Sequence, residues 1–232
     1  METLPKGEPV PPSWRERFSR QIILPQVGEE GQKKWNASSF LLAGDGPALE
    51  AAGLALASSG VSRLWVHTPG SFDPSVWISR VSALEVEKTE APEKVHPRAS
   101  LSIVLTQDPA LRKKMNRLSR KGPSNLLFGW TLGKGFALYC YPPPSSASSC
   151  PCLECFEALN PKAFNPGATE VERILGAMAA SEALQWALTG SSPLAGKLWV
   201  HPLSNAPSLY HEVSASPKCP AALADQGVTP TP

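Results

Sequence analysis

The chain has 232 residues, of which 42% are hydrophobic, and this is enough apolar material to bury one sizeable core. Lys and Arg number 22 against 20 Asp and Glu, so the net charge of +2 lacks the basic excess that binding to a nucleic-acid backbone requires. No apolar run approaches the roughly 20 residues of a membrane span, and the first residues lack the pattern of a signal peptide. We therefore expect a cytoplasmic protein with no membrane or nucleic-acid partner.

Strands and helices alternate along the first part of the chain. An apolar run at 39–43 stops at Gly44-Asp45-Gly46, and the small residues at 48–59 then predict a helix that ends at Gly60. Further strands are predicted at 63–67, 84–88, 101–105, 125–129 and 136–140, and a basic helix at 109–120. This alternation predicts an α/β fold with a Rossmann-like, mostly parallel sheet and helices on both of its faces.

The second part of the chain follows a stretch rich in proline and serine at 141–150. A strong helix is predicted at 170–189, stopped by Gly190. Short strands at 198–201 and 209–213 are expected to close the sheet as a C-terminal antiparallel extension.

These patterns predict a single domain over residues 15–222. Its nucleotide-binding-type half covers about 15–140, and its cysteine-containing half covers about 141–222. The proline-rich residues 1–14 and the unpatterned residues 223–232 are expected to be disordered tails.

Three blocks of sequence carry a resemblance to a known family. They are Arg17-Phe18-Ser19-Arg20-Gln21-Ile22-Ile23-Leu24-Pro25, then Ala51-Ala52-Gly53-Leu54-Ala55-Leu56-Ala57-Ser58-Ser59-Gly60-Val61, and finally Gly176-Ala177-Met178-Ala179-Ala180-Ser181-Glu182-Ala183. The blocks resemble the ThiF/MoeB/HesA family, relatives of the ubiquitin-activating enzymes. Members adenylate the C-terminal glycine of a ubiquitin-like protein, often a sulfur carrier, with ATP and magnesium. The resemblance covers most of residues 15–222, but too few residues precede the strand at 101–105 for the family's full insertion, so we expect a trimmed sheet.

The resemblance places the nucleotide loop at Gly44-Asp45-Gly46-Pro47. It implies that Gly44 and Gly46 approach the phosphates of ATP, because such a loop must turn tightly and expose its backbone N–H groups. Pro47 has no N–H to offer, and Asp45 and Glu50 bring negative charge to a site for anions. We therefore expect ATP to bind poorly at this loop.

Other positions of the implied ATP site are altered in the same direction. The family has an acidic residue at the end of its second strand, where this chain has His67. In the block that follows, Asp73 remains as a candidate cofactor-binding residue, but Val76 replaces an asparagine. Asp108 matches the family's metal-binding aspartate and is a candidate catalytic residue, although Pro109 replaces the asparagine after it. A single carboxylate without further ligands predicts weak binding of magnesium.

Arg20 matches an arginine that, in family dimers, reaches from one protomer into the ATP site of the other. An arginine supplied in this way can stabilise developing phosphate charge. The resemblance therefore implies a homodimer or heterodimer in which Arg20 acts in trans. The alternative from the spacing alone is that Arg17 and Arg20 form salt bridges on the surface of a helix.

The cysteines are clustered. The chain has 5 of them, and Cys150, Cys152 and Cys155 lie close together, which favours a metal or thiol site over a disulfide framework. In the resemblance, Cys152 and Cys155 match the first zinc pair of the family, and Cys219 matches one half of the second pair. A structural zinc takes four ligands, and the candidates for the missing one are Cys150, which completes the predicted set, and His201 and His211. The alternative is that zinc was lost and the cysteines are ordinary reduced thiols.

Three functions are compatible with these residues. The first is a catalytically impaired ThiF/MoeB-like partner subunit that dimerises and binds a ubiquitin-like protein or an active relative. The second is an active ATP-dependent adenylyltransferase of a ubiquitin-like sulfur carrier, in thiamin, molybdopterin or related sulfur transfer, with a rearranged loop. The third is a zinc-stabilised interaction module. The altered loop beside an intact opening block favours the first.

Overall fold

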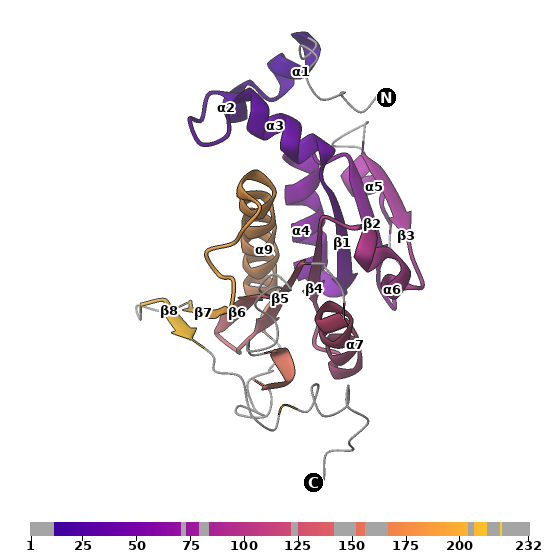
Figure 1. The fold of residues 1–232 in the computed structure, drawn as a ribbon, viewed down its shortest axis with the longest axis vertical. Coiled ribbons are helices and arrows are strands. Elements are labelled where there is room, and N and C mark those ends of the chain that lie inside the picture. Colours follow the sequence, from indigo (N-terminus) through magenta and orange to yellow (C-terminus); the bar gives the residue numbers. More distant parts are fainter. Residues whose placement is uncertain are drawn as a thin grey trace.

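The computed structural model describes residues 12–70, 73–78, 84–121, 125–141, 152–155, 167–203, 207–212 and 219. Within them, helices and strands alternate along the chain (Figure 1). The first helix, α1 (Pro12–Arg17), begins inside the segment 1–14 that the sequence assigns to a tail. Its Trp14 packs edge-on against Phe18, with the ring centroids 5.0 Å apart.

A single mixed sheet forms the centre of the described chain. Its strands are β1 (Ser39–Gly44), β2 (Arg63–His67), β3 (Glu85–Lys88), β4 (Leu101–Leu105), β5 (Asn125–Thr131), β6 (Gly135–Cys140), β7 (Lys197–Pro202) and β8 (Leu209–Glu212). Their order is β3-β2-β1-β4-β5-β6-β7-β8, parallel from β3 to β5 and antiparallel from β5 to β8. The mostly parallel sheet and its antiparallel extension are therefore confirmed. In this order the winding reverses between β1 and β4, so a ligand crevice is expected at the carboxyl ends of these two strands.

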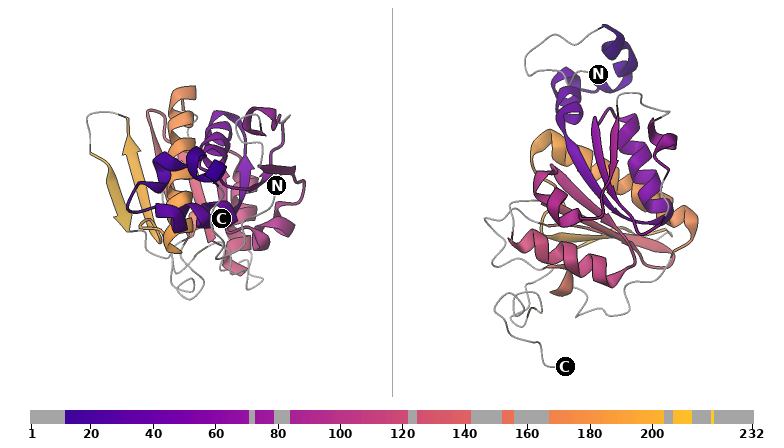
Figure 2. Two further views of the ribbon diagram at one scale, coloured as in Figure 1. Left: turned by 90° about the horizontal axis from the view of Figure 1, so that it is seen from above. Right: turned by 90° about the vertical axis from the view of Figure 1, so that its right-hand side faces the viewer.

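Helices cover both faces of the sheet, as predicted (Figures 1 and 2). The first face carries α3 (Gly28–Ala37), α4 (Gly46–Ser58), α5 (Ser75–Ile78) and α9 (Thr169–Thr189), and the second carries α6 (Pro92–Val95), η1 (His96–Arg98) and α7 (Pro109–Lys121). Successive residues of a strand point to opposite faces. On β1, Phe40 and Leu42 accordingly join the core under α4 and α9, whereas Leu41 and Ala43 join the core under α7.

Helices α4 and α9 pack closely because small residues line their contact. A Cβ on Gly176 would lie 2.1 Å from the carbonyl oxygen of Ala48, so only glycine allows this approach. Further along α9, the indole Nε1 of Trp35 donates to the carbonyl oxygen of Leu184 (2.9 Å). Helix α4 begins at Gly46, two residues before the predicted start, because Pro47 suits the first turn of a helix. The position of α9 thus determines which of its side chains lie beside the loop at the start of α4.

The segment between β3 and β4 differs from the expectation. The sequence left room there for a strand only, but the short helices α6 and η1 follow β3. Pro92 begins α6, again at a first helical turn where its missing N–H costs no hydrogen bond. This segment places His96 in the core beneath α7.

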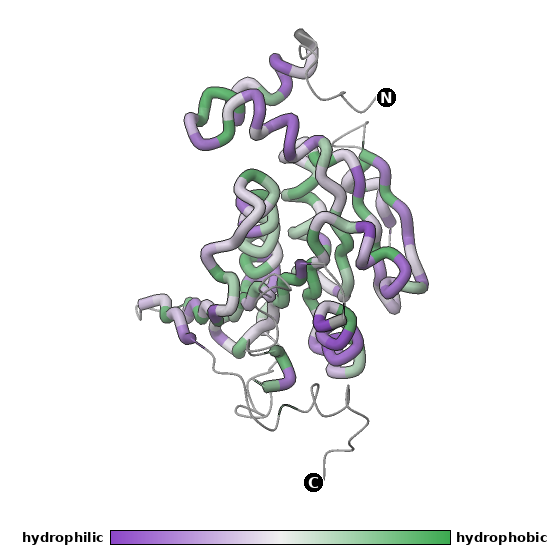
Figure 3. Tube along the Cα trace, in the orientation of Figure 1, coloured by the Kyte–Doolittle hydropathy of each residue, from purple (hydrophilic) through white to green (hydrophobic). Residues whose placement is uncertain are grey.

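Hydropathy distinguishes α7 from α4. Helix α7 is largely hydrophilic, whereas α4 consists mainly of small and apolar residues (Figure 3). Among the described helices, none is both long enough and apolar enough to span a membrane.

Candidate functional site

The loop after β1 passes directly over the end of β4. Gly44 has a φ of +146°, and a Cβ on it would lie 1.8 Å from the carbonyl oxygen of Leu105. Asp45 donates its backbone N–H to the same oxygen (3.3 Å). Only glycine tolerates both the backbone conformation and the contact. Gly44 is therefore required by the packing of this loop, whatever the loop binds.

Two carboxylates lie at the amino end of α4, where the helix dipole and free N–H groups favour an anion. The side chain of Asp45 caps no N–H of α4, and its Oδ1 accepts a hydrogen bond from Thr106 Oγ1 (3.3 Å). Glu172, on α9, has its Oε2 3.5 Å from the position of a Cβ on Gly46. Burial and the negative charge of Asp45 raise the pKa of Glu172. Pro47 in the first turn offers no N–H, so this helix end has one backbone donor fewer beside two carboxylates.

Glu172 was not among the candidates from the sequence. Its place beside Gly46 follows from the close packing of α9 on α4, which no local pattern encodes. The one signal in the sequence is a charged pair, Glu172-Arg173, at the start of a helix that otherwise consists mainly of small and apolar residues.

Asp108 belongs to the same network but acts as a helix cap. Its Oδ1 accepts the backbone N–H of Ala110 (2.8 Å), and its own N–H donates to Thr106 Oγ1 (3.1 Å). A carboxylate that accepts an N–H two residues later stabilises the start of a helix, here α7. The structure thus links Asp108 to Asp45 through the hydroxyl of Thr106 and uses its carboxylate locally.

The space between these groups is narrow. A crevice of about 30 Å³ at the carboxyl ends of β1 and β4 is lined by Asp45, Thr106, Gln107 and Glu172 among others. Gln107 Nε2 donates to Thr131 Oγ1 (2.8 Å) across it. Ligand pockets usually measure about 300–1,000 Å³, so this crevice by itself is smaller than such a pocket.

A larger cavity of about 520 Å³ lies beside the loop, between α4, α5 and α9. Its lining consists of Pro47, Glu50, Ala51, Leu54, Asp73, Val76, Trp77 and Arg173. Asp73 Oδ1 accepts the backbone N–H of Ser75 (2.9 Å), and this hydrogen bond lowers the pKa of Asp73. The structure therefore places Gly44 and Gly46 on either side of Asp45, links Asp108 to Asp45 through Thr106, and places Asp73 in the adjoining cavity.

Arg20 lies at the opposite end of α4 from the loop. It is exposed on α2 (Ser19–Ile22), and the next residue, Gln21, donates to the carbonyl oxygen of Ser58 at the end of α4 (3.4 Å). Helix α4 has 13 residues, and at a rise of about 1.5 Å per residue its ends are about 20 Å apart. Figure 1 shows α2 at the end of the molecule away from the carboxyl ends of the parallel strands. Arg20 therefore cannot reach the loop of its own chain.

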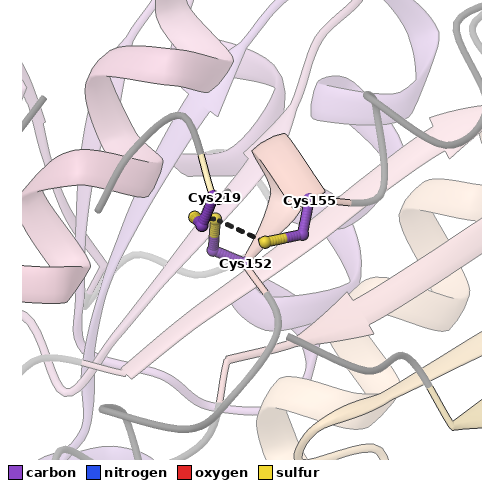
Figure 4. A group of neighbouring side chains, drawn as sticks. All are labelled: Cys152, Cys155 and Cys219. Carbon is purple, nitrogen blue, oxygen red and sulfur yellow. Dashed lines mark hydrogen bonds between the residues drawn. The ribbon is translucent and has the colours of Figure 1, made fainter. Parts of the chain in front are cut away.

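Three of the predicted metal ligands meet in one buried group (Figure 4). Cys152 Sγ lies 3.7 Å from Cys155 Sγ and 3.4 Å from Cys219 Sγ, and all the sulfur atoms lie within 4.8 Å of one another. Thiolates around a tetrahedral zinc, with Zn–S bonds of about 2.3 Å, are separated by about 3.8 Å. The side chains are 1%, 1% and 5% exposed, so the group is closed to solvent. This geometry suits a structural metal and is too wide for a disulfide.

Helix α7 anchors the turn that carries two of these cysteines. Asn116 Oδ1 accepts the backbone N–H of Leu153 (3.1 Å), and Asn116 Nδ2 donates to Glu154 Oε1 (3.1 Å). Arg117 Nε pairs with the same carboxylate oxygen at 3.2 Å. The sequence analysis identified neither Asn116 nor this ion pair. A buried carboxylate held by an amide and a guanidinium fixes the turn and so orients the thiols.

The other candidate ligands are placed differently. Cys150 lies outside the described residues. His201, on β7, contacts Ser208 Oγ through Nδ1 (2.5 Å), and His211 is exposed on β8. Among the described residues, neither histidine belongs to the group of Cys152, Cys155 and Cys219.

Comparison with known proteins supports the family resemblance. The sulfur carrier protein adenylyltransferase of Thermus thermophilus is 27% identical over 247 aligned positions, which cover 88% of this chain and 89% of the relative. No family model matches the chain.

Solved structures show the same fold. E. coli MccB, determined with ATP, superposes with a TM-score of 0.69 at 16% identity over 88% of this chain and 73% of MccB. PaaA superposes with a TM-score of 0.68 at 13% identity over 92% of this chain and 78% of PaaA. Together with the motifs of the sequence, the adenylyltransferase relative and the fold confirm the resemblance of this chain to the ThiF/MoeB/HesA family.

Proposed function

We propose that the chain is a catalytically impaired, ThiF/MoeB-like partner subunit. It dimerises, with a second copy or with an active family member, and binds a ubiquitin-like sulfur-carrier protein or that active member. The observation that carries the proposal is the negative charge of Asp45 and Glu172 at the amino end of α4, where phosphate would have to bind. Residues 15–222 act as one domain in this proposal, extended at its start by the first residues of α1, where Trp14 packs on Phe18.

The candidate nucleotide residues then have a reduced role. Gly44 and Gly46 shape the loop and Asp73 lines the adjoining cavity, but the charged helix end and the missing N–H of Pro47 do not fit ATP. Asp108 caps α7, which leaves it weakly suited to magnesium. We therefore assign no adenylation step to this chain alone.

Arg20 is the residue that the chain contributes to its partner. Its distance from its own loop means that only a site in another protomer could use its guanidinium. An arginine supplied in this way stabilises the charge of a transferring phosphate. It can do so only while the two protomers remain in contact. This assignment rests on the match of the opening block to the family.

The cysteine group is proposed as a structural zinc site. Cys152, Cys155 and Cys219 supply three thiolates. In this proposal Cys150, which lies outside the described residues, supplies the fourth. Bound zinc would join the distant chain segments around 152–155 and 219 and so stabilise the fold. Thiolate ligands persist in a reducing compartment, and a cytoplasmic location is part of the proposal.

Titration of the isolated protein with ATP and magnesium tests the proposal. We expect no saturable binding up to about 1 mM ATP, because the loop repels phosphate. A double variant, Asp45→Asn with Glu172→Gln, is expected to bind ATP about tenfold more tightly, since it removes two negative charges beside the helix end. Glu212→Gln, on the exposed strand β8, removes a distant charge and should leave the affinity unchanged.

The same titration is repeated with candidate partners. Ubiquitin-like carriers that end in Gly-Gly should bind without carrier-dependent pyrophosphate exchange, and an active family member should restore exchange in the mixture. Tight ATP binding and exchange by the isolated chain would show an active adenylyltransferase and overturn the proposal. Failure to bind any carrier or relative would leave only the zinc-stabilised module.

A further inference from the structure

The cavity of about 520 Å³ beside the loop is bounded by three separate elements. Helix α4 lies between α5 and α9 (Figure 1). From one face, α4 contributes Glu50 and Leu54 to the lining, whereas α5 contributes Trp77 and α9 contributes Arg173. Ligand pockets usually measure about 300–1,000 Å³, so this space has the size of a site for a small molecule.

Close packing holds the elements around this cavity in place. The side chain of Trp77 is 2% exposed, and a Cβ on Gly53 of α4 would lie 2.1 Å from its ring. Helix α9 approaches α4 as closely, at the contact of Gly176 with the carbonyl oxygen of Ala48. Both contacts use the space that a glycine leaves free. The cavity is therefore formed without a ligand, which lowers the entropic cost of binding one.

Ionic groups of both signs line the cavity. The side chains of Glu50 and Arg173 are exposed, and neither makes a hydrogen bond or ion pair with any residue that the structure describes. Asp73 adds a second carboxylate, one oxygen of which accepts the backbone N–H of Ser75 (2.9 Å). A carboxylate attracts a cation, and a guanidinium binds a carboxylate with two parallel hydrogen bonds. The lining thus offers a position for each sign of charge.

The rest of the lining is apolar. It consists of Pro47, Ala51, Leu54, Val76 and Trp77. Val76 is 55% exposed, so much of its side chain is available for an occupant to cover. Covering apolar side chains with hydrocarbon is favourable because it removes both from water. The cavity therefore suits a ligand with an apolar body as well as charged groups.

We propose that this cavity binds a small zwitterion with an apolar body, in which an ammonium group pairs with Glu50 and a carboxylate pairs with Arg173. Free apolar amino acids and short apolar peptides share this chemistry. ATP fits less well, because its phosphates would meet the carboxylates of Glu50 and Asp73. The inference adds a ligand to the cavity that the proposed function leaves without ATP, and it rests on the proposed function in that respect alone.

Isothermal titration calorimetry of the full chain without ATP tests the proposal. Three probes share a phenyl ring: L-phenylalanine carries both charges, phenethylamine lacks the carboxylate, and hydrocinnamate lacks the ammonium group. Phenylalanine should bind at least about tenfold more tightly than either of the others. L-Leucyl-L-leucine is titrated in parallel, and the tighter of the two zwitterions shows whether the cavity takes amino acids or short peptides.

Two substitutions assign the charges of the ligand. Glu50→Gln should weaken the binding of phenylalanine about tenfold and leave that of hydrocinnamate unchanged. Arg173→Gln should weaken the binding of phenylalanine about tenfold and leave that of phenethylamine unchanged. Glu212→Gln, on β8 and outside the cavity, is the matched control and should bind phenylalanine as the wild-type protein does. Circular dichroism of the variants checks that the fold is retained.

Equal affinity for the phenyl probes would mean apolar contact alone and would overturn the inference. So would absence of saturation by both zwitterions up to about 10 mM, or affinities that neither Glu50→Gln nor Arg173→Gln changes. The ATP titration described above separates this failure from that of the proposed function. If the isolated chain binds neither ATP nor a zwitterion, only the inference fails, whereas tight ATP binding overturns the proposed function.

Discussion

The loop after β1 and the cysteine turn beside α7 resemble the family in different ways. At the loop the backbone geometry is present, with Gly44 pressed onto the end of β4, but acidic side chains stand where phosphate would bind. At the turn the chemical groups are present, since three thiols meet in the core at distances that suit a metal. The difference teaches that packing by itself can require a loop's glycine, whatever ligand the loop binds.

The largest effect is expected from Cys219→Ser. If the cysteine group binds zinc, the variant should purify without the metal and lose more than about 5 kcal/mol of unfolding free energy, because binding of structural zinc contributes roughly 10–16 kcal/mol in zinc-finger peptides. Metal analysis and urea unfolding measure both quantities. Cys140→Ser is the control, because Cys140 is buried on β6 outside the group and burial raises its pKa to about 12. If the wild-type protein purifies without zinc and its Tm does not respond to chelators, the cysteine turn binds no metal and this prediction is wrong.

Gly44→Ala is expected to have the next largest effect. The new Cβ would meet the carbonyl oxygen of Leu105 at 1.8 Å, and both the clash and the positive φ oppose it, so we expect a loss of about 4 kcal/mol. Gly46→Ala keeps a positive φ but meets its nearest neighbour at 3.5 Å, so its loss should be about 1 kcal/mol. Urea unfolding of the two variants compares them. Similar small losses would show that the loop is not fixed by packing and would weaken the contrast between the regions.

The pH dependence of stability should distinguish the core beneath α7, which contains His96, from the loop after β1. His96 is buried, with Nδ1 2.7 Å from Ser102 Oγ and Nε2 3.2 Å from Ser119 Oγ of α7. Burial lowers the pKa of His96 from 6.5 to about 4. The unfolded chain therefore binds a proton first, and the fold should lose about 3 kcal/mol as the pH falls from about 6.5 to about 4.

Unfolding in urea across this pH range, with NMR titration of the His96 ring, measures the effect. Glu172 at the loop acts in the opposite direction: its raised pKa makes its contribution to stability fall as the pH rises through that pKa. A His96 ring that titrates near 6.5 in the folded protein would contradict the burial of this side chain beneath α7.

Much of the fold could be predicted from the sequence. Apolar runs such as 39–43 and 101–105, punctuated by glycine and proline, identified the strands of the sheet, and the helical pattern at 170–189 identified α9. The short helix α6 was missed because four residues carry too little periodicity to be recognised. The spacing of the cysteines also predicted that Cys152 and Cys155 would act together.

The sequence by itself determined the α/β class, the glycine loop and the cysteine pair, because each depends on residues that are neighbours along the chain. The tertiary structure alone decided that Glu172 stands beside Gly46 and that Asn116 holds the cysteine turn. The family resemblance had already grouped Cys219 with Cys152 and Cys155, and the structure brings their sulfur atoms together. These contacts join segments far apart in sequence. They arise from the close packing of whole helices, in which a glycine such as Gly176 sets the approach and thereby the charge at the candidate site.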